Sequence, residues 1–242
     1  MSGTANIPLS STCVTRILKD VKNIYNNSLN SNGIYYFHSD TDILSGKALI
    51  IGPSDTPYEF GFYFFEVSFP TQYPFEPPIF KFSTCDGNTR FNPNLYKSGK
   101  VCLSILNTWS GEQWSSCQNL SSVLLTLCTI LNEEPFLNEP GVTINHNDYD
   151  NYNKIILYKN FDFAICGILN NDNRIKDKFH KFIPIINKFF IDNYHLIIEK
   201  INKSYIQPCK LNTSIYDMNC YINYDKTIEK LKHLYSILIK LK

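Results

Sequence analysis

A long segment with little hydrophobic periodicity, residues 85–118, holds the residues whose types and spacing suggest chemistry. Within it the triplet Asn92-Pro93-Asn94 precedes Cys102, with seven residues between them. A cysteine thiolate attacks activated acyl groups, and at an ordinary pKa of about 8.5 a few per cent of the thiol is ionised at neutral pH. The alternative is that Cys102 is a buried core cysteine, as we expect for Cys128 in its apolar segment. A loop this long inside a compact domain is either functional or a misassigned element.

The surroundings of Cys102 in the sequence favour acyl transfer between thiols. None of the five histidines lies close to it in sequence, so a cysteine hydrolase would need a histidine brought from afar. Exchange of one thioester for another needs little driving force and no strong base, because a bond of the same kind is broken and made. The residue types alone do not decide between acyl transfer and a cysteine hydrolase.

The segments before this loop predict the sheet that must position it. Residues 12–26 show the three-and-four spacing of an amphipathic helix with a basic outer face. Short aromatic and β-branched runs then predict an antiparallel meander of four strands at 33–39, 47–52, 61–69 and 78–83. The segments between the second and third and between the third and fourth strands are rich in proline. Because proline does not fit a central strand, we expect both to be ordered loops.

Helices are predicted after the loop. Residues 120–131 are apolar almost all round, which predicts a buried helix capped by Ser121 or Ser122. Helical patterning continues at 151–169, 176–201 and 226–241, and no linker rich in glycine, serine or proline separates these segments. We therefore expect an α+β protein whose C-terminal helices pack on the rest.

Composition excludes several classes of protein. With 43% apolar and 19% charged residues the 242-residue chain is not of the disordered type, and a net charge of +1 gives no broad field for nucleic acid or membrane. The sequence shows no signal peptide and no 18-residue apolar run, so we expect a cytoplasmic or nuclear location. There the eight cysteines are expected to be free thiols, and their spacing does not suggest a zinc site.

Four motifs in order resemble those of ubiquitin-conjugating enzymes: GPSDTPYEFG at 52–61, YPFEPP at 73–78, the Asn92-Pro93-Asn94 triplet with Cys102, and an acidic residue before Pro140. Asparagine replaces the more common histidine at position 92, and RFNPNLYKSGKVCLSILNTWSG with ILNEEPFLNEPG is similar to the Z-type class. The resemblance implies a catalytic core at 12–145, with an N-terminal helix and a four-stranded antiparallel sheet. Residues 146–242 would be a helical extension packed on that core.

The resemblance implies that Cys102 accepts ubiquitin or a ubiquitin-like modifier as a thioester and passes it to a substrate lysine or to a ligase. Asn94 would stabilise the carbonyl oxygen or fix its loop, and Glu139 would orient the attacking amine and accept its proton. Asn92, Pro93 and Trp114 would be structural. The alternatives are an ordinary turn asparagine at 94 and a surface acid at 139.

Two partner surfaces follow from the resemblance. Arg16 and Lys19, with Lys22 as an addition, would meet the activating enzyme, and Phe75 with Ser116 and Cys117 would meet the ligase. The alternative for the basic residues is that they are ordinary solvated charges of a helix, and the alternative for Phe75 is that its ring packs inward. A weaker alternative is that YPFEPP is a polyproline ligand for another protein. No metal or small cofactor is expected, since ATP is consumed upstream.

The competing function is a non-catalytic adaptor that keeps the fold, which the presence of Cys102 and Asn94 argues against. The enzyme reading requires the Cys102 sulfur to be reachable from solvent. For the extension, we predict that truncation at Asn145 changes partner choice more than the reactivity of the thiol.

Overall fold

The computed structural model describes residues 9–170 and 173–241. Its centre is an antiparallel sheet in the order β1 (Ile34–His38), β2 (Ser45–Ile51), β3 (Phe62–Ser68) and β4 (Ile79–Phe82). Each strand falls within or beside its predicted segment, so the predicted meander is confirmed. The register places Phe65 opposite both Ala48 and Phe82.

Helix α1 (Ser11–Asn26) and helix α2 (Leu120–Thr129) accompany the sheet, as predicted. The predicted cap of α2 is wrong: the side chain of Asn119 accepts from the Ser122 N–H, and the Ser122 hydroxyl accepts from the Asn119 N–H. This reciprocal pair satisfies two backbone donors at the helix start. The helix is also less buried than predicted, because Leu125 is exposed and Cys128 is half-buried.

The C-terminal region continues with α3 (Tyr149–Lys159), a π-helical turn (Asn160–Ile165) and α4 (Cys166–Leu169). Helices α5 (Asn173–Phe179) and α6 (Ile183–Lys203) follow, and α7 (Tyr224–Leu238) comes last. The segment predicted as one helix at 176–201 is therefore two, because Pro184 lies in the first turn of α6, where a proline starts a helix well. A hairpin of β5 (Cys209–Thr213) and β6 (Met218–Ile222) was not predicted.

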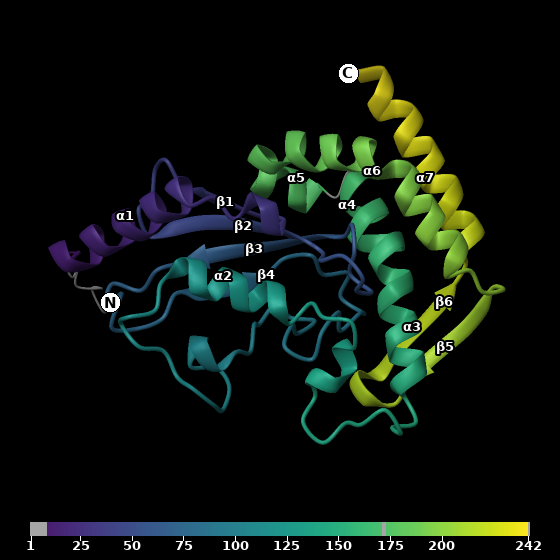
Figure 1. The fold of residues 1–242 in the computed structure, drawn as a ribbon, viewed down its shortest axis with the longest axis horizontal. Helices are drawn as coiled ribbons and strands as arrows, with labels where there is room; N and C mark the ends of the chain where they lie inside the picture. Colours follow the sequence, from purple (N-terminus) through teal and green to yellow (C-terminus); the bar gives the residue numbers. More distant parts are fainter. Residues whose placement is uncertain (1–8, 171–172, 242) are drawn as a thin grey trace, which may run out of the picture.

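The sheet is covered on both faces, which explains why GFYFFEVSF is apolar almost throughout instead of alternating. Figure 1 shows the sheet between α2 and the pair α5–α6. Phe64 of β3 meets the ring of Phe179 at 4.7 Å and that of Phe182 at 5.8 Å between centroids. At the rim of this contact Lys178 pairs with Glu66 at 3.0 Å.

A buried amide also joins the extension to the sheet. Asn160 accepts a hydrogen bond from the Tyr63 hydroxyl at 2.7 Å and donates to the Glu59 carbonyl at 2.8 Å. Gly61 makes this approach possible, since a Cβ there would lie 1.9 Å from the Asn160 side-chain oxygen. The extension therefore packs closely against the sheet, while its boundary at residue 145 stays a prediction.

Candidate active site

Asn94 and Cys102 lie side by side although seven residues separate them. The Cys102 N–H donates to the Asn94 carbonyl at 2.9 Å, and the Asn94 side-chain Nδ2 donates back to the Cys102 carbonyl at 2.7 Å. An isolated antiparallel bridge between Leu95 and Val101 continues this pairing. The backbone thus fixes the triplet beside the cysteine, as a catalytic arrangement of the two requires.

Asn92 braces the triplet from within the fold. It is fully buried, and its Nδ2 donates to the Tyr58 hydroxyl at 2.9 Å and to the Ile130 carbonyl at 2.7 Å. Its Oδ1 accepts the Asn94 N–H at 3.0 Å. Because a buried amide is costly unless its groups are bonded, this network fixes the turn in one conformation. Pro93 is buried as well, and the geometry suits the structural role predicted for both residues.

The Cys102 side chain is covered, which differs from the expectation that its sulfur is reachable from solvent. The residue is only 1% exposed. Cys102 nevertheless does not belong to the contiguous hydrophobic core, whereas its neighbours Val101 and Leu103 do. The residue is therefore covered without being part of that core. Acyl transfer to it requires a movement that uncovers the sulfur.

Glu139 is half-buried and follows the short turn Pro135–Asn138. Its Oε2 accepts a hydrogen bond from the Tyr216 hydroxyl, which the C-terminal hairpin supplies. Burial, together with this bond to the carboxylate, raises the pKa of Tyr216, so the hydroxyl remains a neutral donor. The structure thus brings Glu139 to Tyr216, and no hydrogen bond links it to Cys102 within the described residues.

Arg90 is a site residue that the sequence reasoning missed. Its guanidinium donates to the carbonyls of Asn92 at 3.3 Å and Pro93 at 2.5 Å, and so holds the triplet from outside. The same group lies 3.3 Å from the ring centroid of Tyr96 and 4.7 Å from that of Tyr216. An arginine two residues before the triplet, in a chain with few arginines, was the available signal.

The structure brings the residues of the proposed activating-enzyme surface together with two of the three residues of the ligase surface. Arg16, Lys19, Ser116 and Cys117 line one surface groove. Lys19 is exposed, as predicted, but Arg16 is not a free surface charge. Its guanidinium pairs with Asp20 at 2.9 Å and donates to the Ser116 carbonyl at 2.7 Å. Arg16 therefore ties α1 to the loop after the active site.

Trp114 links that loop to the proline-rich loop. Its Nε1 donates to the Pro74 carbonyl at 2.7 Å, and its ring lies 5.9 Å from that of Tyr73. Phe75, which follows Pro74 in this loop, is 71% exposed, so the alternative of inward packing is wrong for this side chain. An exposed phenylalanine on a loop held this way is available for contact with another protein.

Within residues 9–170 and 173–241, no group of three or more histidine, cysteine or acidic residues could hold a metal ion. No helix in that part of the chain is long and apolar enough to cross a membrane. All eight cysteines are unpaired.

The chain matches a family model and is similar to several known proteins. The model described as "Ubiquitin-conjugating enzyme" matches residues 16–159. "Ubiquitin-conjugating enzyme E2 Z" of Xenopus tropicalis is 35% identical over 231 residues, which make up 93% of this chain and 72% of that protein. The human protein of the same name is 42% identical over 160 residues, covering 65% of this chain and 45% of its own length.

A third relative is much longer than this chain. The human "Dual E2 ubiquitin-conjugating enzyme/E3 ubiquitin-protein ligase BIRC6" is 50% identical over 101 residues, 39% of this chain and 2% of that protein. The family match extends over more than half of the chain and includes the triplet, Cys102 and Glu139. This chain therefore belongs to the ubiquitin-conjugating enzyme family, and within it the chain is similar to proteins of the Z type.

Proposed function

We propose that this chain accepts ubiquitin or a ubiquitin-like modifier from an activating enzyme as a thioester on Cys102, and passes it to a protein lysine or to a ligase. The observation that carries the proposal is the reciprocal hydrogen bonding of Asn94 and Cys102. These two bonds join Asn94 to the backbone N–H and carbonyl of Cys102, and Asn92 and Arg90 hold the turn from both sides, which supports a role for the asparagine beside this cysteine.

In the first step the Cys102 thiolate attacks the thioester carbonyl that joins the modifier to the activating enzyme. The new carbon–sulfur bond forms at Cys102, and the bond to the activating enzyme's sulfur breaks, which releases that sulfur as a thiolate. One thioester replaces another, so no cofactor takes part. The cover over Cys102 must open for this step, and the arrival of the activating enzyme at the α1 groove is a suitable trigger.

In the second step a lysine amine attacks the Cys102 thioester, and negative charge develops on the carbonyl oxygen. An amide bond to the lysine forms, and the carbon–sulfur bond breaks, which returns Cys102 as the thiolate. Asn94 now donates to the Cys102 carbonyl, so in this conformation it positions the loop. A rotation of its side chain would direct the same donor to the oxyanion, and such a donor contributes about 3 kcal/mol of transition-state stabilisation. The amine must lose a proton, and Glu139 is the carboxylate we assign to receive it.

The partners follow from this reaction. We assign the exposed Lys19, with Arg16 behind it, to the activating enzyme, and Phe75 with Ser116 and Cys117 to the ligase. Protein substrates supply the lysine. The proposed location is the cytoplasm or the nucleus, where these partners act.

The test is a charging assay with activating enzyme, ATP and modifier, followed by a non-reducing gel. We expect a shifted band that thiol treatment removes and that Cys102→Ala abolishes. The half-buried Cys128 provides the matched control, so Cys128→Ala should charge normally. In Cys102→Ser an ester resistant to thiol should accumulate, which would identify the acceptor atom.

The burial of Cys102 favours one competing function, a non-catalytic adaptor that keeps the fold. The same assay separates the two. An absence of charging with every activating enzyme and modifier tried, in protein that is folded by circular dichroism, would reject the enzyme and leave the adaptor.

A further inference from the structure

The C-terminal hairpin reaches the candidate active site through its turn, residues 214–217. We propose that Tyr216 in this turn is a positioning residue for the transfer of the modifier to amines, because it fixes the Glu139 carboxylate and the Asn92-Pro93-Asn94 triplet at the same time. The proposal rests on the proposed function and assigns a role in it to the extension.

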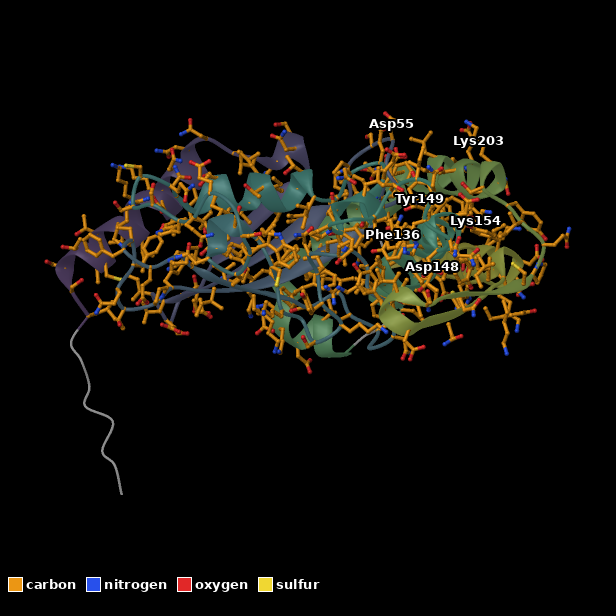
Figure 2. All side chains as sticks on the ribbon, turned by 90° about the horizontal axis from the view of Figure 1, so that it is seen from below. Asp55, Phe136, Asp148, Tyr149, Lys154 and Lys203 are labelled. Atoms are coloured by element: carbon orange, nitrogen blue, oxygen red, sulfur yellow. The ribbon has the colours of Figure 1, made fainter. Side chains whose placement is uncertain are left out.

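The turn is held in place by contacts from several parts of the fold. The Asp148 carboxylate accepts hydrogen bonds from the Ser214 N–H at 3.0 Å, the Ser214 hydroxyl at 2.7 Å and the Ile215 N–H at 2.9 Å. Lys97, between Asn94 and Cys102 in the sequence, donates to the Tyr216 carbonyl at 2.7 Å. Figure 2 labels Asp148 in the half of the molecule that carries this hairpin.

The backbone at Tyr216 supports a functional reading of the turn. Tyr216 has φ of +64° and Asp217 has φ of +45°, both in the left-handed region. That region is unfavourable for residues other than glycine, and for a bulky side chain it is a clear outlier that the surroundings must compensate. A glycine would fit the turn with less strain, so the contacts of the Tyr216 side chain must compensate the cost of this backbone conformation.

The side chain of Tyr216 makes two contacts that serve different parts of the site. Its hydroxyl donates to Oε2 of Glu139, and its ring lies against the Arg90 guanidinium at 4.7 Å. Arg90 in turn donates to the carbonyls of Asn92 and Pro93. One residue of the extension thus contacts the proposed proton acceptor directly and the triplet through Arg90.

The contact with Glu139 has a specific chemical consequence. With Oε2 bonded to Tyr216, the carboxylate is held in one orientation, and within the described residues Oε1 has no hydrogen-bond partner. That oxygen is available to orient an incoming amine and take its proton. A small thiol attacks as a thiolate and has no proton to lose, so its attack should not depend on this carboxylate.

The experiment compares Tyr216→Phe with Tyr221→Phe in the full chain charged with modifier. Tyr216→Phe keeps the ring beside Arg90 and removes only the hydroxyl, while Tyr221 lies on the same hairpin and is 55% exposed. Discharge of the thioester is followed with free lysine and, separately, with a small thiol. We expect Tyr216→Phe to slow discharge to lysine about tenfold, the effect of one lost bond to a charged group, with no change for the thiol. Tyr221→Phe should change neither rate.

A double-mutant cycle with Glu139→Gln shows whether Tyr216 acts through the acid. If it does, Tyr216→Phe has no further effect on lysine discharge in the Glu139→Gln background. Equal slowing with lysine and thiol, or additive effects of the two substitutions, would overturn the positioning role. Failure of Cys102 to charge would instead reject the proposed function. A normal lysine rate in Tyr216→Phe beside a slow one in Glu139→Gln would reject this inference alone.

Discussion

The C-terminal extension meets the rest of the chain in two ways that differ in chemistry. Helices α5 and α6 lie on the sheet through aromatic rings, with Phe37 and Phe182 at 4.7 Å between centroids. The hairpin turn meets the active-site segment through hydrogen bonds and ring–cation contacts to Arg90, Lys97 and Glu139. The first contact buries apolar surface, whereas the second fixes the directions of polar groups.

Because of this difference, the aromatic contact should contribute mainly to stability and the polar contact mainly to the geometry of the candidate site. Burial of apolar area is not directional and contributes to folding in proportion to the area removed from water. A hydrogen bond at a half-exposed site contributes little net stability but sets geometry closely. We therefore expect changes in the α5–α6 contact to unfold the protein, and changes in the hairpin turn to alter chemistry in a protein that stays folded.

Removal of residues 146–242 should have the largest effect. The sequence suggested that this truncation changes partner choice, but the structure shows that it would uncover Phe37, Phe62 and Phe64 on one face of the sheet. An apolar face of this kind aggregates, so we expect insoluble protein. Expression and sedimentation of residues 1–145 check this. A soluble fragment with a cooperative thermal transition would show that the sheet does not need its cover.

Phe182→Ala comes next in size. Phe182 is fully buried between Phe37 and Phe64, and truncation of such a ring to alanine costs about 3–5 kcal/mol of the free energy of unfolding. Phe75→Ala is the matched control, because the same change at a side chain that is 71% exposed should cost less than about 0.5 kcal/mol. Urea denaturation measures both. Equal losses at the two positions would contradict the α5–α6 contact described above.

The smallest expected effect is that of low pH on the hairpin turn, which the Asp148 carboxylate holds. Removal from water raises the pKa of Asp148, but hydrogen bonds from Ile215 and Ser214 outweigh this, so its pKa lies below the ordinary value. A carboxylate with a lowered folded-state pKa stabilises fully above its unfolded pKa of about 3.9, and this contribution is lost as the pH falls through the folded value. The amide NMR signals of Ser214 and Ile215 should therefore hold from pH 7 to pH 5 and move only below about pH 4. A transition near pH 6 would implicate another group.

The sequence was sufficient for the sheet and for the triplet beside Cys102. Strands such as Phe62–Ser68 are dense in aromatic and β-branched residues, and strong local preference of this kind survives in the fold. It was insufficient for the hairpin. The two strands of the segment CKLNTSIYDMNCYI alternate over only five residues each, and its turn lacks the Asn-Gly or Asp-Gly pair that marks a two-residue hairpin.

Contacts between distant residues were the other gap. Tyr216 and Glu139 lie 77 residues apart, and no periodicity connects them. Arg16 illustrates the same limit, since helical spacing places it on the basic face of α1, while carbonyls about 100 residues later take its charge. The burial of Cys102 was only the alternative interpretation of the sequence, because the spacing of a motif does not say how exposed a side chain is.

The cover over Cys102 has a consequence for the chemistry of oxidants. A reactive thiol that stood open would be oxidised to sulfenic acid and beyond by the peroxide that any cell contains. Cys102 is only 1% exposed, whereas Cys117 is exposed and open to such reagents. The burial of the proposed acceptor thiol thus slows an oxidation that an exposed acceptor would undergo.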